Sequence, residues 1–371
     1  MNSIETYRLG RRAHKQGTMM HDATSSGRIR LSARLTAALD SARALAACYV
    51  VLHHFANSRG WSQDGFGILF RFGQEAVLVF FVLSGFVIHS NERSRALHPK
   101  GYFLRRLRRI YPALIVSIFV ATLIAIDNGT FLLQFSWRSL FGTLLSLQDI
   151  SSLKPGVIIN PYLDNQPLWS LSYEVLFYIA YPFVLRAWVR RPDATNAITG
   201  LICCLAYALF VVHPNHFALV AAYFLVWWCG AMAAEAYGLG GRDFRAMARP
   251  LAWLGALCLI AALATWFVGY QGLGFYPFLC FRHFAVALLM FLVLYGPFGA
   301  FLARANLSMA RPAAALASVS YGLYVLHYPL LVAWRRAQSP AGVVVATLLL
   351  GASAYFADAW LNRKLPRAPS S

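Results

Sequence analysis

Charged residues are scarce in this sequence, and acidic ones are the scarcest. Only 13% of the 371 residues are charged, and 33 Lys and Arg outnumber 14 Asp and Glu, which gives a net charge of +19. Hydrophobic residues make up 59% of the chain, far more than in a soluble domain. The basic residues fall between long apolar runs instead of on one hydrated face, so the sequence predicts a membrane protein and no nucleic-acid partner.

Cysteine chemistry is also poorly represented. The six cysteines include no Cys-x-x-Cys pair and no Cys/His spacing typical of zinc ligands. Neither a disulfide framework nor a metal site is therefore predicted. The first 34 residues are polar and Arg-rich and lack the apolar core of a signal peptide, so they are interpreted as a disordered basic cytoplasmic tail.

Long apolar runs take the place of charge. A membrane-spanning helix needs about 20 mostly apolar residues, and lipid offers no partner to an exposed backbone amide, so each span is expected to be helical. Ten such stretches lie at about 37–57, 75–90, 102–126, 168–188, 196–213, 216–237, 250–269, 281–302, 313–334 and 340–361. The sequence thus predicts an all-α polytopic bundle of about ten transmembrane helices within residues 35–362, followed by a short cytoplasmic tail at 363–371.

The distribution of Lys and Arg predicts the orientation, because short cytoplasmic loops carry an excess of both. With the N-terminus in the cytoplasm, the inner segments hold 25 of the 33 basic residues and the outer segments hold seven, while Arg43 lies inside the first span. This places the C-terminus in the cytoplasm as well. The apolar stretch 131–148 would reverse every later loop if it crossed the membrane, so it is interpreted as interfacial or re-entrant.

Five segments carry polar residues where a plain bundle would carry Leu, and ionisable groups inside a membrane are costly enough to suggest function. These segments are LDSARALAACYVVLHHF (39–55), FFVLSGFVI (80–88), YFLRRLRRIYPAL (102–114), PLWSLSYEVLFYIAYP (167–182) and SYGLYVLHYPLL (320–331). Together, and in this order around ten spans, they make the chain resemble the acyltransferase 3 family of membrane O-acyltransferases. The resemblance runs from about residue 37 to residue 334.

The first segment carries the residue that the resemblance makes catalytic. A basic residue and a histidine with ten residues between them match Arg43 and His54, which implies that His54 is the essential histidine. Along a helix these positions are about 16 Å apart, so the helix nearly crosses the bilayer between them. Neutral imidazole accepts the proton of a hydroxyl that attacks a thioester, and an acyl-imidazole intermediate is the alternative that the sequence leaves open.

Glu174 is the second expected catalytic residue. It ends the Ser-x-Glu pattern typical of the family, here SYE at 172–174, although Val175 and Leu176 replace a Glu and a Gln of the common form. If its helix enters from outside, Glu174 lies about one and a half turns in, at the depth of His54. It is expected either to orient the imidazole and stabilise its charged form or to hydrogen-bond within the bundle.

The acyl donor is expected at the opposite, inner side. Four arginines, Arg105, Arg106, Arg108 and Arg109, begin a span there, and the family's Arg-x-x-Arg pair matches Arg106 and Arg109. Guanidinium groups bind phosphate with two parallel hydrogen bonds. The resemblance therefore implies that Arg105, Arg106 and Arg109, joined by Arg43, hold the phosphates of acyl-CoA, most often acetyl-CoA. Positive-inside anchoring or lipid-headgroup contact explains the same density of arginines.

Acceptor recognition is assigned to the outer side. Tyr321 and His327 approach an outer helix end, where His327 either binds the acceptor or packs at the interface, and Asn165 lies in the long outer region 127–166. The resemblance implies that the acceptor is a carbohydrate or glycolipid of the envelope, and a composition rich in Ala and Arg indicates a bacterial inner membrane. Contacts with membrane lipids are expected, and the sequence leaves homo-oligomerisation open.

A proton-coupled transporter is the rival interpretation. In it, His54, Glu174 and His327 relay protons and the arginines bind an anion. The sequence shows no half-to-half repeat, which counts against this reading, and a non-enzymatic scaffold would leave the polar residues of the spans without a purpose. The favoured hypothesis is spatial: donor phosphates lie at the inner arginines, and the thioester reaches His54 near the outer leaflet.

Overall fold

The computed structural model describes residues 29–61, 65–93, 99–241, 244–296 and 310–366. Most of the predicted N-terminal tail, and residues 367–371 of the predicted C-terminal tail, lie outside these ranges. The described chain is helical, and within it no strand forms apart from one isolated bridge between Gln148 and Ile159. The predicted all-α fold is confirmed.

Nine stretches of the described chain are long and apolar enough to cross a membrane. They contain α2 (Ala33–Ser58), α3 (Gly73–Glu92), α4 (Pro99–Asp127), α7 (Trp169–Arg190), α8 (Pro192–Val212), α9 (His216–Gly238), α10 (Phe244–Val268), α11 (Phe278–Tyr295) and α15 (Pro340–Tyr355). A bent pair makes the tenth, in which α13 (Ala310–Ser318) meets α14 (Ser320–His327) and its continuation η5 (Tyr328–Ala333) at 52°. The predicted number of about ten spans is confirmed.

The predicted span 313–334 is therefore not one straight helix. Val319 has φ −113° and ψ 7° and interrupts it. The amide of Gly322, in the first turn of α14, donates to Asp358 Oδ2 at 2.7 Å. Asp358 lies in η7 (Phe356–Leu361), which continues α15, so a carboxylate distant in sequence satisfies an amide that the break exposes.

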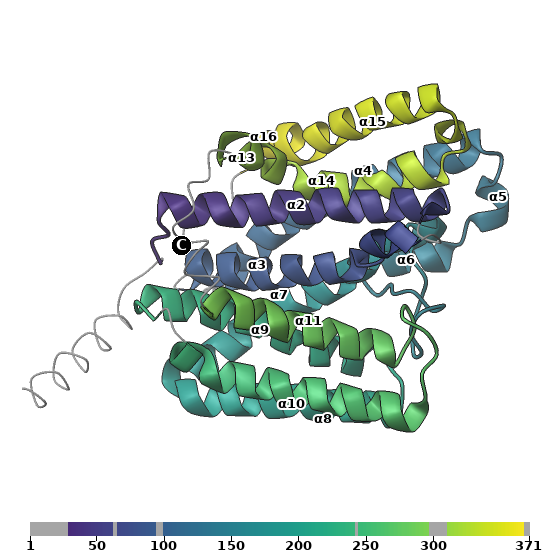
Figure 1. Cartoon of the computed structure of the whole chain (residues 1–371). Helices are drawn as coiled ribbons and strands as arrows, with labels where there is room; N and C mark the ends of the chain where they lie inside the picture. Colours follow the sequence, from purple (N-terminus) through teal and green to yellow (C-terminus); the bar gives the residue numbers. More distant parts are fainter. Residues whose placement is uncertain (1–28, 62–64, 94–98, 242–243, 297–309, 367–371) are drawn as a thin grey trace, which may run out of the picture.

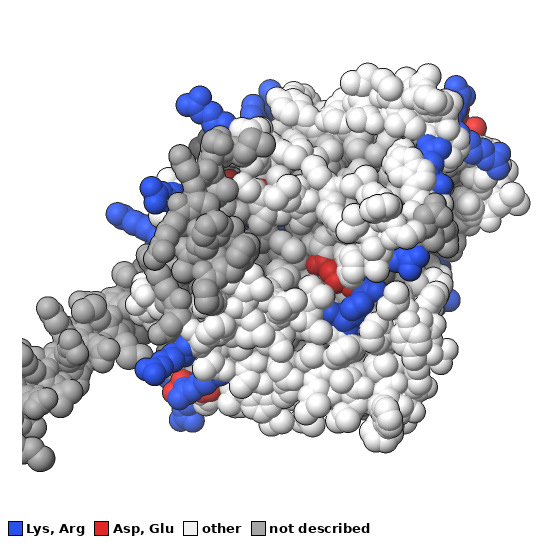
Figure 2. Space-filling model, in the orientation of Figure 1, with Lys and Arg blue, Asp and Glu red and all other residues white. Residues whose placement is uncertain are grey.

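Figure 1 shows that the first described helix, α2, starts at the same end of the bundle at which the last one, α16 (Asn362–Lys364), lies. We name the two ends of the bundle after the ends of α2, the Ala33 end and the Ser58 end. The sequence predicts that the Ala33 end faces the cytoplasm, and this orientation stays a prediction. Figure 2 shows charged side chains at both ends of the bundle and an almost uncharged flank between them.

The apolar stretch 131–148 lies at the Ser58 end (Figure 1). It forms two short helices, α5 (Phe131–Gln134) with four residues and α6 (Trp137–Leu144) with eight. Neither is long enough to span a bilayer, which takes about 20 residues. The prediction that this stretch does not cross the membrane is confirmed.

Two glycines allow α3 and α9 to pack closely in the middle of the bundle. A Cβ atom on Gly85 would lie 2.0 Å from the carbonyl oxygen of Trp227, and one on Gly230 would lie 2.2 Å from that of Val82. No side chain fits either position, so the helices approach at backbone contact distance, as small residues allow in membrane bundles. This contact fixes α3, whose first turns form part of the cavity described below.

Candidate active site

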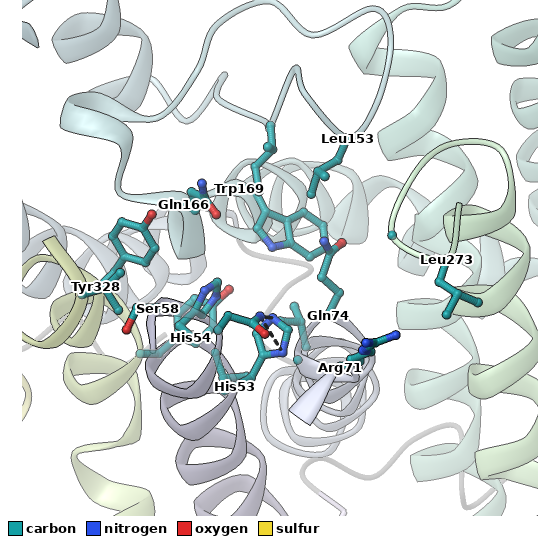
Figure 3. A pocket seen from close by; sticks show the side chains of 18 of the residues that line it. His53, His54, Ser58, Arg71, Gln74, Leu153, Gln166, Trp169, Leu273 and Tyr328 are labelled. Carbon is teal, nitrogen blue, oxygen red and sulfur yellow. Dashed lines mark hydrogen bonds between the residues drawn. The ribbon is translucent and has the colours of Figure 1, made fainter. Parts of the chain in front are cut away.

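A cavity of about 470 Å³ lies at the Ser58 end of the bundle. Figure 3 shows the side chains around it. Its wall is built by the last turns of α2 with His53 and His54, by the first turns of α3 and α7 with Gln74 and Trp169, and by the bent span with Tyr328. Four helices, α2, α3, α7 and α11 with Arg282, therefore converge on one space together with the far end of the bent span, and two imidazoles lie on its floor.

The two adjacent histidines have different surroundings. Nδ1 of His53 hydrogen-bonds to the carbonyl oxygen of Phe70, and a Cβ atom on Gly73 would lie 2.2 Å from the His53 ring. His53 thereby fastens α2 to the turn η2 (Gly65–Phe70) and to the start of α3. The ring of His54 instead lies 5.3 Å from the ring of His327, centroid to centroid. His53 is thus packed into the wall of the cavity, whereas His54 faces the imidazole of His327.

His327 is completely buried behind His54. Its Nδ1 lies 3.1 Å from the carbonyl oxygen of Leu323, and because a carbonyl can only accept, Nδ1 carries the proton of the neutral ring. Nε2 then presents a lone pair, and it has no hydrogen-bond partner in the described structure. His327 is therefore held in one tautomer with an unused acceptor next to the predicted catalytic histidine.

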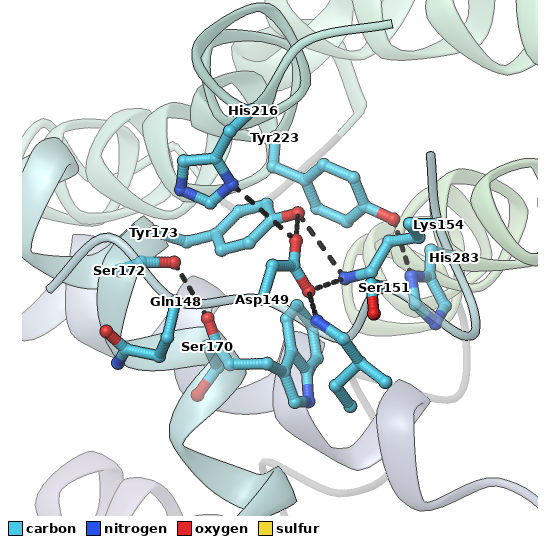
Figure 4. A network of polar contacts seen from close by, with 12 residues as sticks. Gln148, Asp149, Ser151, Lys154, Ser170, Ser172, Tyr173, His216, Tyr223 and His283 are labelled. Carbon is cyan, nitrogen blue, oxygen red and sulfur yellow. Dashed lines mark hydrogen bonds and ion pairs between the residues drawn. The ribbon is translucent and has the colours of Figure 1, made fainter. Parts of the chain in front are cut away.

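A buried polar network holds the loop over the cavity (Figure 4). Lys154 Nζ lies 2.6 Å from Asp149 Oδ1, neither side chain is exposed, and Tyr173 donates to the same carboxylate at 2.6 Å. Lys154 Nζ also lies 4.0 Å from the ring centroid of Trp169. Because Trp169 lines the cavity, the network fixes part of the cavity wall through a cation–π contact.

Glu174 does not line the cavity. It accepts hydrogen bonds from Ser84 Oγ at 3.1 Å and from the hydroxyl of Tyr178. The cavity contact of α7 comes from Trp169, five residues earlier, so Glu174 lies about 7.5 Å further along the helix. The structure brings His54 and His327 together, and it places Glu174 nearer the middle of the bundle.

One protein family matches most of the chain. The family model described as an acyltransferase domain matches residues 36–359. The chain belongs to this acyltransferase family. With about ten apolar spans, this member of the family is a multi-pass membrane protein.

The chain is similar to three bacterial relatives over part of their length. Nodulation protein 10 of Rhizobium leguminosarum is 28% identical over 47% of this chain and 51% of its own. The peptidoglycan O-acetyltransferase OatA of Listeria monocytogenes is 28% identical over 44% and 26%, and the putative peptidoglycan O-acetyltransferase YrhL of Bacillus subtilis is 25% identical over 79% and 48%. The chain thus matches about half or less of these relatives. No solved structure matches it significantly.

The predicted donor arginines of this acyltransferase lie at the Ala33 end, and several of them are paired. Arg105 donates to both oxygens of Glu92, at 2.8 and 2.6 Å, and Arg106 donates to Glu92 at 3.2 Å. Arg109 is the more exposed group, with 39% of its side chain accessible and Asp358 at 4.0 Å. Arg43 pairs with Asp40 at 3.2 Å. Arg109 is therefore the most exposed of these four arginines, while Arg105 and Arg106 share one carboxylate.

Arg108, in the same run, serves the chain itself. Its Nη2 donates to the carbonyl oxygens of Asn362 at 2.9 Å and Leu365 at 3.2 Å. These bonds attach the C-terminal end of the described chain to α4. The structure thus gives the four arginines between residues 105 and 109 unequal tasks that their spacing alone does not reveal.

None of the three predicted acceptor-binding residues belongs to the cavity lining, because His327 is buried behind His54 and the other two lie elsewhere. Asn165 is buried, and its Nδ2 donates to Ser117 Oγ and to the carbonyl oxygen of Val325, each at 3.0 Å. It ties the loop before α7 to α4 and α14, while its neighbour Gln166 lines the cavity. The guanidinium carbon of Arg109 lies 5.5 Å from the ring centroid of Tyr321, which places Tyr321 beside the donor arginines.

Sequence reasoning missed three charged residues of functional interest. Glu92 is the buried partner of the arginine run, and Arg282 and Arg71 line the cavity. Arg282 stands near one end of an apolar run, so a charge close to a predicted span was the available signal. Within the described ranges, no group of three or more His, Cys, Asp and Glu is arranged to hold a metal ion.

Proposed function

We propose that the protein is an O-acyltransferase of a bacterial inner membrane that moves an acetyl group from cytoplasmic acetyl-CoA to a hydroxyl of an envelope carbohydrate. The observation that carries this proposal is the placement of His54. Its ring lies on an open cavity, backed by the unpaired Nε2 of His327, within a chain of the acyltransferase family. The named activities of OatA and YrhL support acetyl as the group and a glycan as the acceptor.

His54 supplies the base in this proposal. The acceptor hydroxyl gives its proton to His54 while its oxygen bonds to the thioester carbonyl carbon. The C–S bond then breaks, and the imidazolium returns the proton to the departing thiolate, so the products are an ester and a free thiol. Transfer through an acyl-imidazole on His54 gives the same products, and chemical trapping of the acylated ring separates the two routes.

His327 is the positioning residue for this base. Its Nε2 lone pair accepts the N–H of His54 after a small rotation of either ring, because centroids 5.3 Å apart allow a direct hydrogen bond between two imidazoles. That bond fixes which nitrogen of His54 faces the cavity as the proton acceptor. A neutral imidazole thus takes the orienting part that a carboxylate takes in a catalytic triad.

The donor binds at the Ala33 end in this proposal. Arg43, Arg106 and Arg109 hold the phosphates, while Glu92 keeps Arg105 in place. Arg43 and His54 lie on the same helix, about 16 Å apart. A long, thin thioester arm entering beside Arg43 would run along α2 towards the cavity. In this proposal the acceptor binds there, from the other side of the membrane.

The test is transfer by the purified full chain in lipid nanodiscs, with labelled acetyl-CoA and a panel of bacterial envelope glycans. We expect His54→Ala to abolish transfer while the thermal unfolding temperature is kept, and His213→Ala, an exposed histidine outside the cavity at the same end, to have no effect. Undiminished transfer by His54→Ala removes His54 from the mechanism. Proton-coupled uptake without transfer to any glycan favours the transporter.

A further inference from the structure

Two arginines line the cavity without a part in the reaction described above. Arg71 lies between η2 and α3, and Arg282 lies in the first turns of α11. No Asp, Glu or Lys occurs among the described residues that line the cavity, so the charge of the lining is positive. A cavity lined by charge of one sign favours ligand groups of the opposite sign.

Arg282 is held in place by a residue outside the cavity lining. Its Nε donates to Glu75 Oε1, and its guanidinium carbon lies 5.6 Å from the ring centroid of Phe72. The side chains of Arg282 and Glu75 are only 14% and 5% exposed. The bond to Glu75 occupies Nε, and the two Nη groups of the same fork are donors that can meet two oxygens of one anion.

The rim of the cavity beside these arginines is apolar and exposed. On η2, Phe66 is 87% and Leu69 is 60% exposed, and on the facing loop Leu273 and Phe275 are 42% and 46% exposed. Leu273 itself lines the cavity. Figure 2 shows a small cluster of acidic and basic groups in a hollow of the otherwise uncharged flank, over the region where α3 and α11 lie in Figure 1. This rim suits an acceptor that arrives along the membrane surface.

We propose that Arg71 and Arg282 form a subsite for an anionic group of the acceptor, a carboxylate or a phosphate, that lies beside the hydroxyl to be acylated. The inference rests on the proposed function, because it assigns the cavity to the acceptor. It adds that the acceptor is acidic. A sugar carboxylate and the phosphate of a lipid-linked sugar share the chemistry that two guanidinium groups recognise. Such recognition does not depend on which sugars carry the anionic group.

Binding to the His54→Ala form tests the subsite without requiring transfer. The probes are a glucuronate-containing oligosaccharide, its carboxyl-reduced counterpart, and a polyprenyl-phosphate-linked sugar in the nanodisc. We expect at least one acidic probe to bind about tenfold more tightly than the reduced counterpart, since a hydrogen-bonded charge pair contributes about one factor of ten. Preference for the oligosaccharide identifies a sugar carboxylate, and preference for the lipid-linked probe identifies a phosphate.

The variants separate recognition from folding. Two variants are expected to remove the preference for the acidic probe and its salt dependence. One is Arg71→Gln, and the other is a double variant with Glu75→Gln and Arg282→Gln. In the double variant each new amide side chain keeps a hydrogen-bonding partner. Arg335→Gln, an exposed arginine at the same end outside the cavity, is expected to keep both. Equal binding of acidic and neutral probes to the parent, or a preference that survives in both the Arg71→Gln variant and the Glu75→Gln/Arg282→Gln variant, overturns the subsite.

The same measurements distinguish failure of the subsite from failure of the proposed function. Arginine-dependent binding of an acidic probe without acetyl transfer by the intact protein keeps the subsite and removes the enzyme. Transfer that depends on His54 and is indifferent to acceptor charge keeps the enzyme and removes the subsite.

Discussion

The imidazole rings of His54 and His327 lie 5.3 Å apart, centroid to centroid, with their planes tilted by 38°. One ring lines the cavity and the other is buried behind it with an unpaired nitrogen. His54 comes from the first span, and His327 comes from the last turn of α14 in the tenth, beyond the break at Val319, so the two residues are remote in sequence. In the proposed mechanism their meeting, and not either residue alone, orients the base.

Replacement of His327 should slow the chemical step. We expect His327→Ala to lower kcat by about 10- to 100-fold, as loss of a partner that orients a histidine typically does, with little change in KM for either substrate. His327→Gln should recover part of the rate, because its side-chain oxygen can accept the N–H of His54. Steady-state kinetics of both variants measure this. Equal rates for Ala and Gln would show that His327 acts only by filling space.

Glu92 and Arg109 should affect different properties. The side chain of Glu92 is 4% exposed and pairs with two arginines. Glu92→Gln replaces its carboxylate with a neutral amide, so we expect a clear fall in thermal unfolding temperature and no rise in KM for acetyl-CoA. Arg109→Gln removes a more exposed guanidinium and should raise that KM about tenfold with the unfolding temperature kept. Unchanged KM after Arg109→Gln would remove Arg109 from the donor site.

The contact of α3 with α9 predicts a sharp difference between two glycines. Gly85→Ala forces a Cβ atom against the carbonyl oxygen of Trp227 and should destabilise the fold by about 1–3 kcal/mol, as overpacking does. Gly255→Ala in α10 has nothing within 4 Å of its new Cβ and should be neutral or slightly stabilising. Thermal unfolding in detergent compares them. Equal tolerance of both changes would mean that α3 and α9 are further apart than described.

The ion pair above the cavity should matter far more than an exposed one. Lys154→Met leaves Asp149 buried without its cation, which should cost about 3–5 kcal/mol of stability. The double change with Asp149→Asn should be less damaging than Lys154→Met alone. Arg249→Met breaks a pair with Asp193 whose side chains are 65% and 77% exposed, and should change stability by about 0–1 kcal/mol. Similar losses for Lys154 and Arg249 would contradict a structural part for the buried pair.

The periodic and compositional features of the chain predicted its spans well. The run 102–126 forms α4 (Pro99–Asp127), and the stretch 131–148, which the charge distribution excludes as a span, forms two short helices. Such features are local, because length, hydropathy and flanking charge lie within one segment. The break at Val319 was not predicted, since Asp358, which caps the new helix start, lies in another span.

Partners from other segments also explain what the sequence could not predict about the site. Local spacing gave Glu174 the depth of His54, but Gln166–Leu168 forms a turn that brings Trp169 to the cavity and sets Glu174 deeper. Likewise Arg105 and Arg106 matched a phosphate-binding pattern, while their shared carboxylate, Glu92, lies on α3. Local motifs identified candidate functional residues among the polar side chains of the spans. Only the packing of different segments shows which of these residues share a partner.

Sided transfer in proteoliposomes tests the central claim most directly. With the protein in one known orientation, labelled acetyl-CoA is supplied on the side of Arg109 and the glycan on the side of His54. The account predicts label on the glycan in this arrangement, loss of that label in His54→Ala, and none when donor and acceptor positions are exchanged. Transfer with both substrates confined to the His54 side would contradict it.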